Sequence, residues 1–182
     1  TIPTISFEGR FQYLKNGKIK NKLHKNEQIM LDGAHAVTDA KNLANYLRNI
    51  KMPKYAIWAM MKNKEPDLFI KQFKGIFKKI ITIPIENEQN CMSAKDLKAI
   101  AEKNQFNVNK ANNFSEAIKK IISKNKKLII CLGSLYNLGN ILNSNDDNVS
   151  SADIVDQASS YTDKSVEMKA LNRSRKLISK IN

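Results

Sequence analysis

The sequence has little of the material from which disulfide-stapled, zinc-binding and membrane-spanning proteins are built. Its 182 residues contain two cysteines, Cys91 and Cys131, and two histidines, His24 and His35. This set excludes a Cys/His zinc site and a disulfide framework, so we expect two reduced cysteines in a cytoplasmic protein. No apolar run approaches the roughly 20 residues that a membrane helix needs, so no membrane partner is expected.

Glycine is also scarce, and with it the loops that hold phosphates. The six glycines stand at positions 9, 17, 33, 75, 133 and 139, and none belongs to a G-x-x-x-x-G-K-[ST] phosphate loop. The sequence shows no Ser-His-Asp arrangement and no acidic pair with metal-ligand spacing. It starts Thr-Ile-Pro-Thr, without an initiator Met or a signal sequence, which indicates a piece of a longer polypeptide. Alone, the chain has an incomplete catalytic set.

What the sequence has in excess is lysine. Lys and Arg number 31 against 17 Asp and Glu, for a net charge of +14, but 27 of the 31 are Lys and only four are Arg. Lysine accompanies 22 Asn and 22 Ile, the residues that AT-rich codons favour. Arginine, with its planar fork, is the usual choice for reading phosphates and bases. We therefore favour a compositional origin of the charge over a nucleic-acid surface, and we keep a basic, non-catalytic binding module as the alternative.

Short apolar runs alternate with helical patterns along residues 29–142. The runs are near-continuously apolar, as in strands covered on both faces, and lie at 29–31, 55–60, 80–83 and 128–132. Helical spacing of apolar residues falls between and after them, at 40–50, 66–77, 97–101, 115–122 and 135–142. Expected helix starts are Thr38 or Asp39, Pro66 with Asp67, Ser93 with Asp96, and Ser115. This alternation predicts an α/β, Rossmann-like three-layer domain with a mostly parallel sheet.

The two ends of the chain differ from this middle part. Residues 11–19, with Asn16-Gly17 as a tight turn, predict a small N-terminal hairpin. The polar run Asn143–Asn148 is a linker by composition. Beyond it, residues 146–182 carry six basic and six acidic residues and favour two helices. We therefore predict one domain over 1–143 and a linker with a helical tail of unknown role over 144–182.

In open α/β sheets ligands bind beyond the carboxyl ends of the strands, and one such end carries Leu31-Asp32-Gly33-Ala34-His35. Gly33 permits a sharp turn or close approach of a ligand, and Asp32 could accept hydrogen bonds from ribose hydroxyls. His35 stands near a helix N-terminus, where anions are favoured. The alternative is that Asp32 and His35 only bond backbone groups in a turn.

Three further segments are candidates for the same edge. Gly133-Ser134, at a strand-to-helix junction, could offer backbone N–H groups to an anion, although a simple helix cap by Ser134 is the favoured reading. Arg10, between aromatic residues, could stack on a base or pair with a phosphate; the alternative is an ordinary surface ion pair with Glu8. Lys62 and Lys64 follow the strand at 55–60, but the abundance of lysine makes either one weak evidence.

Three motifs, in this order, resemble the C-terminal domain of folylpolyglutamate synthase / dihydrofolate synthase, in the Mur ligase superfamily. Glu8-Gly9-Arg10-Phe11-Gln12 resembles the family's Pro-Gly-Arg-hydrophobic-Gln. Residues 31–36, Leu-Asp-Gly-Ala-His-Ala, resemble its Leu-Asp-Gly-Ala-His-Asn, and residues 133–136 resemble its Gly-Ser-Leu-Tyr. The resemblance covers roughly residues 3–143.

The resemblance implies part of an ATP-dependent ligase that adds L-glutamate to dihydropteroate or folate through an acyl phosphate. An N-terminal ATPase domain of the same polypeptide would hold the phosphate loop and the Mg²⁺ ligands, so this chain would hold no metal and be inactive alone. Carried over to this sequence, Arg10, Asp32, Gly33, Lys64 and Ser134 would bind ATP, with Asp32 on the ribose. His35 would be catalytic, toward the phosphates or the incoming glutamate.

The sequence departs from the family pattern directly after His35. The family's Asn is Ala36 here and the Pro that often follows is Val37, which puts the activity of the parent enzyme in doubt. Thr38 or Asp39 is expected to cap the helix instead. The sequence does not separate dihydropteroate from folate, or a related Mur-type ligase with another acceptor, and it does not give the oligomeric state.

Overall fold

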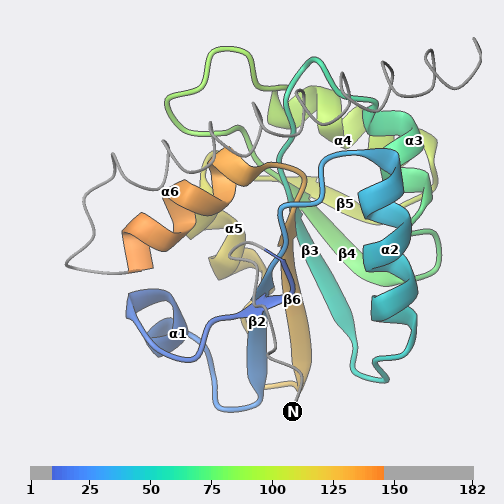
Figure 1. Ribbon diagram of the computed structural model, residues 1–182. Helices are drawn as coiled ribbons and strands as arrows, with labels where there is room; N and C mark the ends of the chain where they lie inside the picture. Colours follow the sequence, from blue (N-terminus) through green and yellow to red (C-terminus); the bar gives the residue numbers. More distant parts are fainter. Residues whose placement is uncertain (1–9, 146–182) are drawn as a thin grey trace, which may run out of the picture. The chain divides into compact units, whose positions relative to one another are not determined.

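The computed structural model describes residues 10–145, and a mixed six-stranded sheet runs through this part of the chain (Figure 1). Its order is β1-β2-β6-β3-β4-β5, and every neighbouring pair is parallel except β1 with β2. The α/β fold predicted from sequence is confirmed. The strands are β1 (Gln12–Tyr13), β2 (Glu27–Leu31), β3 (Lys54–Trp58), β4 (Phe77–Thr82), β5 (Val108–Lys110) and β6 (Lys127–Leu132).

Six helices within the described residues complete the fold, and none of them has the length and apolar character needed to cross a membrane. They are α1 (Lys18–Lys22), α2 (Val37–Arg48), α3 (Pro66–Lys71), α4 (Ala94–Lys103), α5 (Phe114–Ile121) and α6 (Leu135–Asn145). The predicted tail helices and the Glu8-Gly9 part of the first motif lie outside the described residues.

The helices form two layers, one on each face of the sheet. Apolar residues of α2, α3 and α4 share one core cluster, and those of α1, α5 and α6 share the other. Figure 1 shows α2 on one side of the strands and α1 and α6 on the other. Strand β6 serves both layers, because Leu128, Ile130 and Leu132 face the first cluster while Ile129 and Cys131 face the second. Burial on both faces explains why residues 128–132 of this strand are all apolar.

The prediction of an N-terminal hairpin at Asn16-Gly17 is wrong for its second strand. Strand β1 does pair antiparallel with β2, but the turn leads into helix α1 instead of a return strand. The end of α6 supplies the reason, since the Asn145 side chain accepts the Ile19 N–H at 3.0 Å and donates to the Asn16 carbonyl at 3.1 Å. Helix α6 therefore includes residues 143–145, which the composition had assigned to the linker.

Several helix ends differ from the sequence expectations. Helix α3 ends at Lys71 instead of reaching Phe77, because Gly75 turns the chain at φ +78° and Phe77 begins β4. Helix α5 begins at Phe114, capped by Asn113, not by Ser115. Strand β5 escaped notice because it is short and exposes two of its three residues at the sheet edge. The predicted Ser93 cap of α4 is confirmed.

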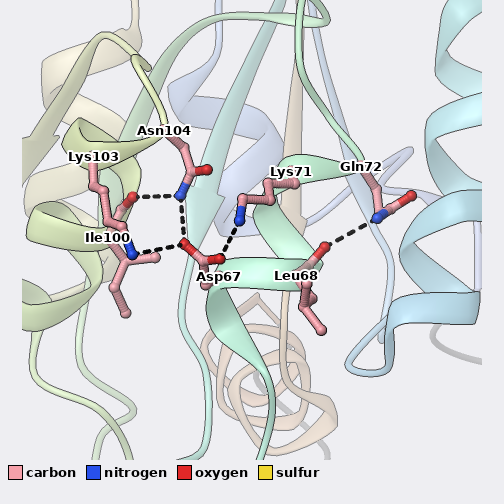
Figure 2. A network of polar contacts seen from close by, with 7 residues as sticks. All are labelled: Asp67, Leu68, Lys71, Gln72, Ile100, Lys103 and Asn104. Carbon is pink, nitrogen blue, oxygen red and sulfur yellow. Dashed lines mark hydrogen bonds and ion pairs between the residues drawn. The ribbon is translucent and has the colours of Figure 1, made fainter.

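A polar network joins α3 to α4 on one face of the sheet (Figure 2). Asp67, in the first turn of α3, accepts a hydrogen bond from the Asn104 amide at 2.9 Å and pairs with Lys103 at 3.8 Å and with Lys71. The same Asn104 amide donates to the Ile100 carbonyl at 2.8 Å, at the end of α4. The start of α3 is thereby fastened to the end of α4.

A buried ion pair fastens the amino edge of the sheet, opposite the strand ends that carry the motifs. Lys127 and Glu27 lie 3.6 Å apart, with side chains 4% and 0% exposed. Glu27 also accepts the Ser123 and His24 backbone N–H groups at 2.7 and 2.9 Å. Lys127 donates to the Ile121 carbonyl at 2.8 Å. Each charge therefore has polar partners, as a buried pair requires.

Candidate functional site

The sheet changes its winding direction between β2 and β6. These strands are neighbours, yet the helix after β2 packs on one face of the sheet and the helix after β6 packs on the other. The chain therefore leaves the two carboxyl ends in opposite directions, and such a switch point is where open α/β sheets bind ligands. Residues 32–36 follow β2 and residues 133–134 follow β6, so two of the three motifs meet at this point of the sheet.

Backbone hydrogen bonds tie the two loops together. The Asp32 N–H donates to the Cys131 carbonyl, and the Gly133 N–H donates to the Ala34 carbonyl, both at 2.9 Å. Gly133 has φ +103°, and a Cβ there would lie 2.1 Å from the Ala59 carbonyl oxygen at the end of β3. Only glycine fits this approach. Because the Gly133 N–H is used inside the protein, it is not a donor left open for an anion.

The Asp32 carboxylate builds the turn from within. Its side chain has no exposed surface; Oδ1 accepts the Ala34 N–H at 2.8 Å and Oδ2 accepts the Phe11 N–H at 3.0 Å. Burial raises the pKa of Asp32, although the two N–H donors and the Arg10 charge oppose the rise. The sequence left open whether this carboxylate faces a ribose or bonds backbone groups in a turn. The structure shows the backbone bonds, through which the side chain joins two segments far apart in the chain.

Arg10 lies over this carboxylate, held by two acidic side chains. Its Nη1 is 4.0 Å from Asp32 Oδ1 and its Nη2 is 3.0 Å from Asp39 Oδ1, with the Arg10 side chain 38% exposed. The next residue, Phe11, has φ +47°, which is strained for a bulky side chain. Two contacts hold it, the bond to Asp32 and a ring contact of 4.5 Å with Tyr46. The first and second motifs are thus brought together.

His35 lies directly before helix α2, at the end of the loop that contains Asp32. His35 is half-buried, and its Nδ1 lies 2.8 Å from the Gly33 carbonyl oxygen. Because a carbonyl only accepts, Nδ1 carries the hydrogen and Nε2 is the nitrogen left for another group. Helix α2 has Ala36 at its N-cap with no side-chain cap, so neither Thr38 nor Asp39 caps it as expected. The first N–H groups of α2 thus have no capping side chain, an arrangement that suits an anion.

The remaining two predicted residues have weaker support. Ser134 is 2% exposed, and its hydroxyl accepts the Asn137 N–H at 3.4 Å, in the position of a helix cap. Lys64 follows β3, in a turn whose backbone bond runs from the Lys64 N–H to the Met61 carbonyl. Lys64 therefore stands at the same edge of the sheet, but no contact between the described residues links it to Arg10 or Asp32.

Two features of the site were missed from sequence. The sequence predicted Asp39 as a helix cap because it falls in the first turn of a helix. Its ion pair with Arg10 could have been sought by asking which acidic residue pairs with each of the four arginines. Trp58, in the apolar run at 55–60, has a buried indole N–H without a partner among the described residues, and a Cβ added to Gly133 would lie 3.0 Å from that nitrogen. Within residues 10–145 no group of three His, Cys, Asp or Glu side chains gathers as metal ligands do.

Comparison with protein families gives two matches. The family described as dihydrofolate synthetase, C-terminal domain, matches residues 15–144. A family described as DnaK suppressor protein DksA, N-terminal domain, matches the short stretch 139–182, most of which lies outside the described residues. No curated protein matches the chain in sequence.

Solved structures share the fold at low sequence identity. Escherichia coli FolC in complex with DHPP and ADP matches 75% of this chain with TM-score 0.60 and 15% identity. Thermotoga maritima folylpolyglutamate synthase matches 74% with TM-score 0.61 and 22% identity. Mycobacterium tuberculosis folylpolyglutamate synthase complexed with ADP and AMPPCP matches 80% with TM-score 0.63 and 15% identity. The chain covers only 30%, 29% and 34% of these three structures.

Proposed function

We infer that this chain, which belongs to the family of dihydrofolate synthetase C-terminal domains, is the nucleotide-closing domain of an ATP-dependent ligase. The observation that carries the proposal is the meeting of Arg10, Asp32 and the uncapped start of α2 at the switch point of the sheet. Because the chain covers about a third of its solved relatives, we assign the phosphate loop to a separate N-terminal ATPase domain of the same polypeptide.

The proposed reaction joins L-glutamate to dihydropteroate or a folate. The acceptor carboxylate takes the γ-phosphoryl group of ATP, which releases ADP and leaves an acyl phosphate. The glutamate amine then forms the amide bond and phosphate departs. Relatives with bound ADP and AMPPCP support the nucleotide, and a Yersinia pestis relative with AMPPNP and Mn ion supports a divalent cation. We propose Mg²⁺, which would neutralise phosphate charge, with ligands from the N-terminal domain.

The residues of this domain would bind and orient the phosphates. Arg10 supplies the charge and planar donor set that suits phosphate oxygens. Gly33, which has no side chain, would permit a close approach of the ligand. His35 would present Nε2 to the phosphates or to the glutamate, since Nδ1 is engaged. Lys64 would add a cation from the end of β3. For Ser134, burial and its capping bond support a role in holding the start of α6 instead of direct contact with ATP.

The test uses the full-length polypeptide that contains this chain, assayed for ATP-dependent and glutamate-dependent product with dihydropteroate, folates and other Mur-type acceptors. Arg10→Ala is expected to lower kcat/KM for ATP by about 100-fold, in the range of a lost charged contact. Arg48→Ala is the matched control, because Arg48 is an exposed arginine whose hydrogen bonds within residues 10–145 go to Asn45 and Gln72. Equal kinetics in the two variants would overturn the assignment, and product with a different acceptor alone would correct the substrate.

A further inference from the structure

We propose that Asp39 is a positioning residue that holds Arg10 closed over Asp32, and that a nucleotide must draw Arg10 away before it can reach the Asp32 carboxylate. This inference rests on the proposed function. It concerns a residue outside the three motifs, and it accounts for a ribose-binding candidate with no exposed surface.

The contacts around Asp32 show which group can move. Phe11 and Ala34 reach the carboxylate through backbone N–H groups, at 3.0 and 2.8 Å, and both belong to segments that the sheet and the loop hold in place. Arg10 reaches it through a long side chain, 4.0 Å away, that is 38% exposed. The distance from Nη1 to Oδ1 is too long for a hydrogen bond. Of the three partners, Arg10 is the one that a ligand can displace.

Asp39 is what keeps Arg10 in this position. Its carboxylate lies 3.0 Å from Nη2, a hydrogen-bonded ion pair, and it projects from the first turn of α2, whose positive end favours an acidic side chain there. No capping bond holds Asp39 to the helix, so its side chain is available to Arg10. The pair with Asp39 therefore holds the Arg10 side chain in place, and this position also brings Arg10 within 4.0 Å of Asp32.

Local charge gives the direction of the effect. One guanidinium faces two carboxylates, so the closed arrangement presents no net positive charge to a phosphate chain. A nucleotide gains the Arg10 charge only when the pair with Asp39 breaks, and it then meets an uncovered Asp32. Affinity is lowered by the fraction of molecules that are closed. A partly exposed ion pair shifts such an equilibrium by about 2- to 5-fold.

The experiment measures ADP binding by calorimetry to the full-length polypeptide, at low and at high salt. Asp39→Asn removes the charge and keeps the size of the side chain, and is expected to tighten ADP binding by about 2- to 5-fold at low salt. The gain is expected to shrink as salt screens the pair in the parent protein. Asp39→Glu is expected to restore the parent affinity. Asp96→Asn, the same change in the first turn of α4, is the control and is expected to leave affinity unchanged.

The outcomes separate the two proposals. Unchanged or weaker ADP binding in Asp39→Asn, with binding intact in the parent, overturns the positioning role and leaves the proposed function standing. A residue that only stabilised α2 would give that result, together with a lower unfolding temperature. Absence of ADP binding in the parent overturns the proposed function and this inference with it.

Discussion

Replacing Gly133 by alanine is expected to damage both the fold and the candidate site. Gly133 has φ +103°, and an added Cβ would meet the Ala59 carbonyl oxygen at 2.1 Å and the Trp58 ring at 2.7 Å. The first contact is with backbone at the end of β3, where β3 pairs with β6. The new methyl group therefore cannot be accommodated by turning a flexible side chain, and one strand end has to move.

The magnitude follows from two separable contributions. Placing a non-glycine residue at positive φ costs about 1–3 kcal/mol of stability. Overpacking against a fixed neighbour adds about 1–3 kcal/mol. Gly75→Ala isolates the first contribution, since Gly75 has φ +78° and nothing lies within 4 Å of its added Cβ. We therefore expect losses of roughly 2–6 kcal/mol for Gly133→Ala and about 1–3 kcal/mol for Gly75→Ala.

Urea unfolding followed by fluorescence gives both values. Trp58 is the single tryptophan of the chain, is buried, and stacks on Phe69 at 6.2 Å, so its emission reports on this domain and on the edge where the methyl group is added. Equal losses of stability in the two variants would refute the reasoning, because the close approach of Gly133 to β3 would then contribute nothing. A displaced loop is also expected to weaken ADP binding in Gly133→Ala, through the lost support of Ala34 by the Gly133 N–H.

Two further predictions concern buried charges. Lys127→Met is expected to destabilise the domain by about 3 kcal/mol, the low end for breaking a buried pair, because Glu27 keeps its two backbone donors. Thermal unfolding measures this loss of stability. The double variant with Glu27→Gln is expected to lose less stability than the sum of the two single variants. The pKa of Asp32 is raised in the folded state, so the folded state keeps the Asp32 proton to higher pH than the unfolded state does. The contribution of Asp32 to stability therefore falls as the pH rises above 3.8, its ordinary pKa. Unfolding of the parent and of Asp32→Asn across that window checks the sign, and a rise contributed by Asp32 would contradict it.

The fold was predictable because its strands have a strong and simple pattern. Strands buried on both faces carry continuous apolar runs, so β2, β3, β4 and β6 could each be predicted to within a few residues of their ends. The elements that the sequence did not predict are short. Helix α1 depends on the side chain of Asn145, more than 120 residues away, and no local pattern at Asn16-Gly17 reveals such a partner. Strand β5 carries too few buried residues to show a period.

The candidate site was predictable in position but not in arrangement. Strand ends and glycines located the Asp32 loop and Gly133, because the topology of a parallel sheet brings such ends to one edge. The distribution of hydrogen bonds could not be predicted. The sequence allowed the Gly133 N–H to face an anion and Asp32 to face a ribose, whereas the structure uses both groups to join neighbouring loops. Sequence gives residue types at an edge, but only the fold shows which polar atoms remain unused.

The charge at the site also runs against the composition of the chain. The net charge of +14 suggests a surface that attracts anions anywhere, yet the group best placed for a phosphate, Arg10, is balanced by Asp32 and Asp39. Salt screens dispersed lysines over about 8–10 Å at physiological strength, so they add attraction at a distance and little selectivity. On the proposal above, nucleotide affinity at this edge of the sheet depends on whether Asp39 holds Arg10. A variant that changes this partner is therefore expected to change nucleotide binding more than the removal of a single surface lysine away from this edge of the sheet.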